Sequence, residues 1–462
     1  MFSDDFLQAI VRAALSRGGD YADVFVEETA DAIVGYSDRK VTSISSGVIQ
    51  GAGIRIIDGR NFVYLYASDV DEQGLQALAR DCAAARKAGA AGVMAAGRAV
   101  GAKRLHSYAV YPGTVDMARK VDLVRRGDAA AREASGEISQ VVISYLDRHQ
   151  KVEMATSEGR IVRDERVRTR YVVEAIAQRG DRKETGYFAP GKSRGFELFD
   201  TITPESVARE AARIALVMLD ADYAPAGTMP VVIDNGFGGV IFHEACGHAL
   251  EATSVADDAS VFCGKLDQKI AADCVTAIDD GTIPNEWGSA AYDDDALETR
   301  RNVLIQDGVL KSYLVDRLGQ AKMGTPANGC GRRESYRFAP TSRMSNTYID
   351  NGKHKLADLI ASVDTGLYCR NMGGGSVNPP TTDFNFAVSE AYLIEKGKLG
   401  KPVKNATLIG KGSEILMNVD MVADNLEFGT GMCGSSSGSV PANVGQAAIL
   451  VHGLVIGGRA QE

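Results

Sequence analysis

The sequence contains no hydrophobic run of 18 residues, the length that a membrane-spanning helix requires. Its beginning also lacks the apolar stretch after a basic start that marks a secretory signal. The seven cysteines are scattered, without the close pairs that would indicate a disulfide framework. Together these absences predict a cytoplasmic protein in a reducing compartment, with no membrane partner.

Basic residues are also fewer than acidic residues in this chain. The chain has 51 lysines and arginines against 60 acidic residues, which gives a formal net charge of -9. Proteins that bind nucleic acid typically present a basic surface, so we expect no direct nucleic-acid partner. The hydrophobic content of 45% and the charged content of 24% are typical of globular proteins, and 462 residues are enough for two or three domains.

Histidine is scarce, with six in the chain, yet two of them lie five residues apart on either side of an acid in His243-Glu244-Ala-Cys-Gly-His248. On an ideal helix, residues five apart point about 140° away from each other. His243 and His248 can therefore share one metal ion only if the helix widens locally. A single π-helical turn is the expected form, and Gly247 would permit the distortion. In this arrangement Glu244 is the natural general base, taking a proton from a water molecule that the metal activates.

Two imidazoles do not complete such a site, because a catalytic zinc usually has three protein ligands. Any cysteine, histidine or acid elsewhere in the chain is a candidate for the third. Cys433 is the most conspicuous, since it lies in the glycine-rich segment 429–438, where the backbone can approach a site closely.

Hydrophobic periodicity predicts three parts. The first part is expected to contain a helix at 6–17, strands at 21–28, 30–37 and 53–66, and a helix at 71–86. The second part is expected to contain a helix at 115–134, strands at 139–145, 151–156 and 167–178, and a helix capped by Thr203. Linkers are predicted at the Ala/Gly-rich stretch 84–101 and at 224–228. We therefore predict an N-terminal domain (1–95), a central domain (96–225) and a C-terminal catalytic domain (226–462).

The third part is rich in glycine and strands, with hairpin turns predicted at Asp307-Gly308 and Lys396-Gly397 and one helix, which carries the histidine motif. That helix follows a buried strand at 230–234, and its apolar residues should anchor it in the core. The predicted fold class is α+β, with helix-flanked mixed sheets in the N-terminal and central parts and a strand-rich C-terminal domain that carries the metal-binding helix.

Further segments, in this order, carry a family resemblance: the motif His243–Glu251, Gly331–Tyr336, Arg343–Thr347, Gly373–Gly375, Ser389–Ile394, Pro402–Gly410 and the Cys433 turn. They resemble the TldD/PmbA metallopeptidases, and more specifically the TldD branch. The resemblance covers essentially the whole chain and is strongest from residue 224 onward. PmbA-type partners lack the histidine motif that this chain has. Departures after the triple glycine and after Cys433 concern substrate preference rather than the metal site.

The resemblance implies zinc held by His243, His248 and Cys433, with Glu244 as the catalytic acid and base. It also implies a dimer, either a homodimer or a heterodimer with a PmbA-type subunit, that encloses the active site in a cavity. Its substrates would be extended peptides, including leader segments removed during peptide maturation, and unfolded small proteins that undergo proteolysis.

Other interpretations stay open at this point. The chain could be a non-catalytic, zinc-containing peptide-binding subunit of a protease assembly, although Glu244 beside the first ligand favours chemistry. Gly434–Gly438 matches a serine-hydrolase elbow with Ser436 as nucleophile, but Pro441 follows too soon for the helix that this elbow needs.

Two charged groups also have more than one interpretation. The acidic run Asp293–Asp295 could bind a hard cation or a basic substrate, but such runs are more typical of solvated loops. Arg332, Arg333 and Arg343 could grip a peptide carboxylate, or they could form ion pairs within the fold.

Overall fold

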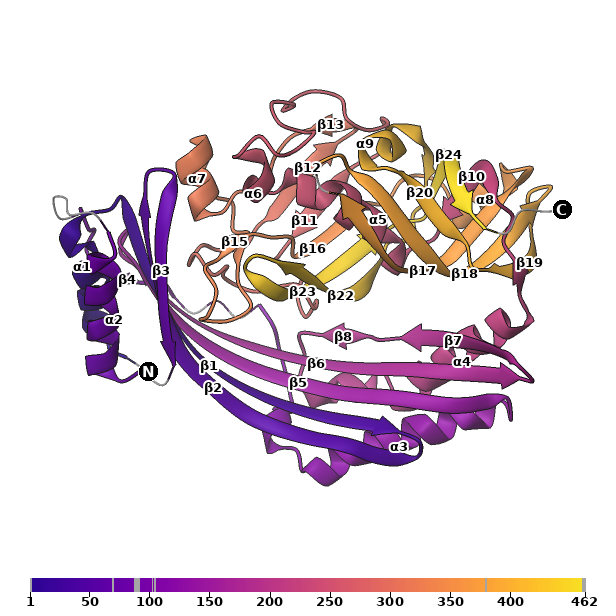
Figure 1. Cartoon of the computed structure of the whole chain (residues 1–462), viewed down its shortest axis with the longest axis horizontal. Helices are drawn as coiled ribbons and strands as arrows, with labels where there is room; N and C mark the ends of the chain where they lie inside the picture. The colour runs from indigo at the N-terminus through magenta and orange to yellow at the C-terminus, as the bar shows by residue number, and fades with distance from the viewer. Residues whose placement is uncertain are drawn as a thin grey trace.

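A long, curved sheet spans the molecule, with helices on its outer face and the strand-rich C-terminal part over its inner face (Figure 1). The computed structural model describes residues 2–68, 70–86, 92–101, 103, 105–378 and 380–458. Within them, helices and sheets are present throughout, which confirms the predicted α+β class. No helix in these ranges is both long and apolar enough to cross a bilayer.

The long sheet draws its strands from both sides of the predicted boundary at residue 95. The described strands run in the order β3-β2-β1-β5-β6-β4, and β7 and β8 also pair with β6. Their bounds are β1 Tyr21–Ser37, β2 Lys40–Asp58, β3 Asn61–Ser68, β4 Arg98–Ala99, β5 Ile138–Thr156, β6 Arg160–Arg179, β7 Arg182–Phe188 and β8 Gly191–Lys192. The division of the chain into three domains at residues 95 and 225 stays a prediction.

The strands of this sheet are longer than their hydrophobic patterns indicate. β5 continues unbroken for 19 residues, where the sequence predicts two strands separated by a polar stretch at 146–150. The polar side chains in that stretch have partners: Asp147 accepts a hydrogen bond from Lys120 at 2.6 Å, and Arg148 pairs with Asp31 at 2.7 Å. Because these partners come from distant segments, the polar residues fit inside a continuous strand.

Two pairs of helices cover the outer face of the long sheet, one pair near each end (Figure 1). One pair is α1 (Asp4–Ala14) and α2 (Glu72–Ala84), and the other is α3 (Met117–Ala134) and α4 (Pro204–Asp220). The predicted start of α4 is confirmed, since the Thr203 side chain accepts a hydrogen bond from the Ser206 backbone N–H at 3.2 Å. Each pair contributes to its own hydrophobic core against the sheet.

The C-terminal part contains two larger sheets and a short strand pair. The first sheet has the order β17-β10-β24-β20-β18-β19-β9, with β21 beside β24; the second has the order β13-β12-β11-β16-β23-β22. The bounds are β9 Asp222–Tyr223, β10 Gly227–Ile233, β11 Ala277–Asp280, β12 Arg301–Gln306, β13 Val309–Leu310, β14 Gly331–Arg332, β15 Thr341–Ser342, β16 Asn346–Ile349, β17 Thr365–Asn378, β18 Asp383–Glu395, β19 Lys398–Lys404, β20 Thr407–Lys411, β21 Val419–Val422, β22 Glu427–Ser435, β23 Gly438–Gln446 and β24 Ile449–Gly457.

The C-terminal part holds more helices than the one that the sequence predicts. Besides the motif segment, it has α6 (Ala252–Val255), α7 (Arg317–Met323), α8 (Leu356–Ala361) and α9 (Gly412–Ile415). All are shorter than two full turns, which leaves too few residues for a clear helical period in the sequence. The predicted hairpins at 307–308 and 396–397 are confirmed, and both residues of each turn have positive φ.

The acidic run at 293–295 lies at the contact between the long sheet and the C-terminal part, so the interpretation as a solvated loop is wrong. All three aspartates are buried. Asp295 pairs with Arg55 of β2 at 2.5 Å, and Asp294 pairs with Arg166 of β6 at 2.8 Å. These arginines compensate the buried negative charge and join the two parts of the molecule.

Candidate metal centre

The histidine motif forms a widened helical segment directly after β10. It consists of α5 (Val240–Phe242), a π-helical turn at His243–Gly247 (η5) and a 3-10 turn at His248–Leu250 (η6). The predicted π-helical turn is therefore confirmed. Its extra residue brings the two histidine rings to the same side, with ring centroids 5.2 Å apart. The apolar residues of the segment lie in the main C-terminal core, as expected.

Gly247 contributes space rather than an unusual backbone conformation. Its φ and ψ of -57° and -49° are ordinary right-handed helical values. A Cβ atom at this position would lie 2.2 Å from the Sδ atom of Met344, which is fully buried. The motif therefore requires glycine here because of the side chain packed against it.

Cys433 reaches both histidines from the hairpin formed by β22 and β23. Its Sγ lies 3.1 Å from the Nε2 atom of His243 and 3.3 Å from the Nε2 atom of His248. The three potential donor atoms all lie within 4.8 Å of one another. In the described part of the chain, this is the one group of three or more such residues compact enough to hold a metal ion.

The electrostatics of this group favour a thiolate. Burial by itself would raise the pKa of Cys433, but the charge of His243 and hydrogen bonds to both histidines lower it to about 3. A thiolate with two imidazole nitrogens is a donor set well suited to a divalent metal ion such as zinc. The residues present therefore fit the metal that the sequence pattern implies.

Glu251, the last residue of the motif, is hydrogen-bonded to the ring nitrogen of His248 that does not face Cys433. Its Oε2 lies 3.0 Å from the Nδ1 atom of His248, and its side chain is buried. Since the carboxylate accepts a hydrogen bond from Nδ1–H, Nε2 is the ring nitrogen left to bind a metal ion. The spacing of three residues along a helical segment is the signal in the sequence for this contact. No separate role for Glu251 is predicted from the sequence.

Glu244 is the member of the motif that is open to solvent. Its side chain is 33% exposed, and its Oε2 lies 3.7 Å from the Nε2 atom of His248. His243, in contrast, is 2% exposed. Glu244 therefore lies beside the donor group while it stays accessible to water and to a substrate.

Arg343 and Arg332 fix the hairpin that presents Cys433. Arg343 donates hydrogen bonds to the backbone carbonyl of Cys433 and, at 2.9 Å, to that of Gly438. Arg332 donates to the backbone carbonyls of Met344 at 2.6 Å and Pro441 at 2.7 Å. Both guanidinium groups are buried, and these bonds serve the fold rather than a peptide carboxylate.

Arg333 also belongs to the contact between the two parts of the molecule. Its guanidinium donates to the backbone carbonyl of Asp294 at 3.0 Å, and it lies 4.3 Å from the centre of the Phe25 ring. Its side chain is 0% exposed. A structural role therefore accounts for all three arginines that the sequence leaves with two interpretations.

The serine-hydrolase interpretation does not fit the hairpin. Ser436 lies in the turn between β22 and β23, whereas the elbow of that enzyme class joins a strand to a helix. His452, the one histidine that follows Ser436 in the sequence, lies on β24 with its Nε2 3.3 Å from Asp420. The segment therefore serves to carry Cys433.

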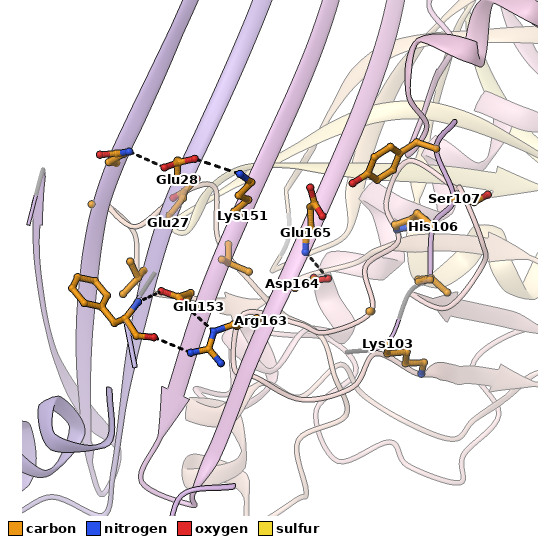
Figure 2. A pocket seen from close by; sticks show the side chains of 18 of the residues that line it. Glu27, Glu28, Lys103, His106, Ser107, Lys151, Glu153, Arg163, Asp164 and Glu165 are labelled. Carbon is orange, nitrogen blue, oxygen red and sulfur yellow. Dashed lines mark hydrogen bonds and ion pairs between the residues drawn. The ribbon is translucent and has the colours of Figure 1, made fainter. Parts of the chain in front are cut away.

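A large cavity lies away from these residues. It has a volume of about 1020 Å³ and is bounded by β1, β5, β6 and the segment around His106 (Figure 2). Charged side chains on its walls pair with each other, as Glu153 does with Arg163 at 2.8 Å and Glu28 with Lys151 at 3.7 Å. None of the residues of the metal centre lines it.

Comparison with known proteins covers nearly the whole chain. Sequence families described as PmbA/TldA metallopeptidase domain 1, central domain and C-terminal domain match residues 22–88, 110–219 and 226–458, respectively. The metalloprotease TldD homolog of Haemophilus influenzae is 35% identical over 96% of this chain and 94% of its own. A metalloprotease of Methanothermobacter thermautotrophicus is 31% identical over 95% of this chain and 96% of its own. The crystal structure of TldE from Thermococcus kodakarensis shares the fold, with a TM-score of 0.76 at 17% identity over 98% of this chain and 99% of that one.

These relatives define the class of the protein, which is a metalloprotease. The chain belongs to the PmbA/TldD family of metallopeptidases.

Proposed function

We propose that the protein is a zinc-dependent peptidase in which His243, His248 and Cys433 hold the metal and Glu244 is the general acid and base. The observation that carries the proposal is the convergence of two Nε2 atoms and one thiol sulfur within 4.8 Å, beside the exposed carboxylate of Glu244. The donor group has three members, where a closed structural zinc site has four, and this supports a catalytic site over a purely structural one.

Zinc is the metal that this donor set favours. Imidazole and thiolate ligands suit zinc, whereas magnesium and calcium prefer oxygen ligands. A relative from Saccharolobus solfataricus, 25% identical over 97% of this chain, is called a zinc metalloprotease TldD homolog. When bound, zinc would supply Lewis-acid polarisation of the scissile carbonyl and of a water molecule.

The side chains around the metal perform the proton transfers. Glu244 takes a proton from the attacking water on its carboxylate and delivers that proton to the nitrogen of the departing amine. The carbonyl carbon gains the hydroxyl and loses the amine, so one peptide bond and one water become a carboxylate and an amine. Glu251 keeps the proton of His248 on Nδ1 throughout, which maintains Nε2 as a donor to the metal.

The substrates that we propose are unstructured peptides, including leader segments, and unfolded small proteins. β22 is the edge strand of its sheet and carries Cys433, so an extended peptide added along this edge would lie beside the donor group. Recognition through the main chain tolerates varied side chains. A series of peptides N-methylated at successive backbone positions tests this mode, and cleavage of every member at the parent rate would contradict it.

We further propose that the enzyme works as a dimer, either with itself or with a PmbA-type subunit, and that the dimer encloses the site in a cavity. The likeness to the TldE structure over nearly the full length supports a shared architecture. Mass measurement of the purified chain, alone and mixed with such a subunit, tests the assembly. Full peptidase activity in a species with the mass of one chain would overturn it.

Glu244→Gln tests the catalytic role. The amide cannot accept the proton of water, so we expect cleavage of an unstructured peptide to fall by about 10²- to 10⁴-fold while zinc content is unchanged. Glu414→Gln is the matched control, because the side chain of Glu414 is 67% exposed and pairs with Lys411. Equal cleavage rates for the Glu244 variant and the parent would refute the assignment.

A further inference from the structure

A second, much smaller cavity lies between the long sheet and the C-terminal part. Its volume is about 30 Å³. Among its lining residues, Arg148, Arg166 and Arg168 belong to β5 and β6, whereas Arg332 and Pro441 belong to β14 and β23. With Arg333, five arginines thus line a space of a few ångströms at the contact between two parts of the molecule.

Three of these arginines have carboxylate partners. Arg148 pairs with Asp31 at 2.7 Å, Arg166 pairs with Asp164 and Asp294, each at 2.8 Å, and Arg333 lies 3.6 Å from Asp23. Their charges are compensated inside the fold.

Arg168 and Arg332 differ from the other arginines in their hydrogen-bond partners. Among the described residues, no carboxylate oxygen lies within 4.0 Å of either guanidinium. Arg168 donates to the backbone carbonyls of Trp287 at 3.1 Å and Ser289 at 3.4 Å, and Arg332 donates to those of Met344 and Pro441. Arg168 is 4% exposed and Arg332 is 9% exposed. Both guanidinium groups are therefore buried at the cavity with backbone carbonyls as their hydrogen-bond partners.

The acids that line the cavity are engaged elsewhere. Asp294 binds Arg166 and also accepts a hydrogen bond from the backbone N–H of Arg333 at 2.8 Å. Glu334 accepts from the backbone N–H of Ser439 at 2.7 Å. Burial, together with the neighbouring charge of Asp295, raises the pKa of Asp293 well above its ordinary value. None of these acids forms a direct ion pair with Arg168 or Arg332.

Burial of these two charges without a direct ion pair has an electrostatic cost. Burial lowers the pKa of Arg168 to about 9, and the charges of Arg166, Arg332 and Arg148 add to this effect. Burial also lowers the pKa of Arg332, to about 10, although the negative charges of Asp294 and Asp279 act in the opposite direction. A guanidinium stays protonated at neutral pH, so the cost is relieved by a counter-ion rather than by loss of a proton.

We propose that this cavity binds one monatomic anion of the halide class, such as chloride, as a counter-ion for Arg168 and Arg332. A water molecule needs a cavity of roughly 10–15 Å³ by the same measure, so 30 Å³ admits one such ion or two waters and excludes a peptide carboxylate with its chain. The anion joins the middle of the long sheet to β14 and β23. Val440, next to Pro441 on β23, pairs with Cys433, so the ion also supports the strand pair that presents this cysteine.

Diffraction from crystals of the full chain grown with bromide in place of chloride tests the site directly. The expected result is an anomalous peak between the guanidinium groups of Arg168 and Arg332. Two ordered waters without an anomalous peak would overturn the proposal. The position of the peak distinguishes this site from any halide bound at the metal centre, so the result does not depend on the proposed function.

Thermal unfolding gives a second measurement. At fixed ionic strength, replacing gluconate by chloride should raise the midpoint of the parent in a saturable manner, because an anion bound to the folded state alone stabilises it. Arg168→Gln should abolish this rise. Arg209→Gln should keep it, because Arg209 is 59% exposed and lies 3.8 Å from Glu133. Equal responses of the parent and the Arg168 variant would contradict the site. If the Arg168 variant does not fold, the bromide experiment on the parent decides.

Discussion

Replacing Glu251 should weaken the metal centre in graded steps. In the folded chain its Oε2 lies 3.0 Å from the Nδ1 atom of His248, and its side chain is 3% exposed. Glu251→Gln keeps an oxygen acceptor of nearly the same shape but removes the negative charge. Glu251→Ala removes the acceptor as well and leaves the Nδ1–H group of His248 without a partner in a buried position.

The expected magnitudes follow from this contact. Loss of a hydrogen-bonding partner behind a metal ligand costs about 10- to 100-fold in metal affinity, or about 1.4–2.8 kcal/mol. A hydrogen bond to a charged group is roughly twice as strong as a neutral one. We therefore expect Glu251→Gln near the lower end of this range and Glu251→Ala near the upper end.

Competition with a chromophoric chelator would measure zinc affinity in the parent and in both variants. Glu414→Gln serves again as the control, because it removes a carboxylate from the surface of the same part of the molecule. Thermal unfolding of each metal-free protein would show whether the fold is retained. Equal zinc affinities in all four proteins, with the fold intact, would refute the role of Glu251.

Two further predictions concern packing and pH. Gly247→Ala should destabilise the fold by about 1–3 kcal/mol, because its Cβ would meet Met344 at 2.2 Å; in a double-mutant cycle Met344→Ala should remove most of this cost, and strictly additive losses would contradict the steric explanation. His106 is partly buried and hydrogen-bonded to the backbone of Asn285 and Ser289, and desolvation lowers its pKa to about 4. The folded state favours the neutral form of His106. Its contribution to the free energy of unfolding is therefore complete above about pH 6.5 and is lost as the pH falls toward about 4, and this contribution is at most about 3 kcal/mol. His106→Gln should therefore reduce the difference in unfolding midpoint between pH 7 and pH 4.5; an unchanged difference would sink this assignment.

The sequence predicts local features of the site well. The spacing of His243 and His248 requires a widened helix, and the π-helical turn is present. Thr203 marks the start of α4, and the turns at 307–308 and 396–397 follow from their glycines. Each of these features depends on residues within one or two turns of chain, so local chemistry is enough to specify it.

Long-range features are harder to predict. Cys433 lies 190 residues beyond His243, and a glycine-rich turn shows only that a close approach is possible. The burial of Asp293–Asp295 depends on Arg55 and Arg166, which come from two distant strands. The polar middle of β5 also resembles a loop until its partners on neighbouring segments are known. In each case the deciding partner is set by the tertiary fold rather than by the neighbouring sequence.

Zinc content per chain, measured by elemental analysis, is the most direct test of the central claim. The parent should hold about one zinc, as a three-ligand catalytic site requires. Cys433→Ser should hold little, and Cys274→Ser should match the parent because Cys274 is exposed and lies outside the donor group. A parent without zinc after preparation with ample metal, or a Cys433 variant with full zinc content, would contradict the proposed metal centre.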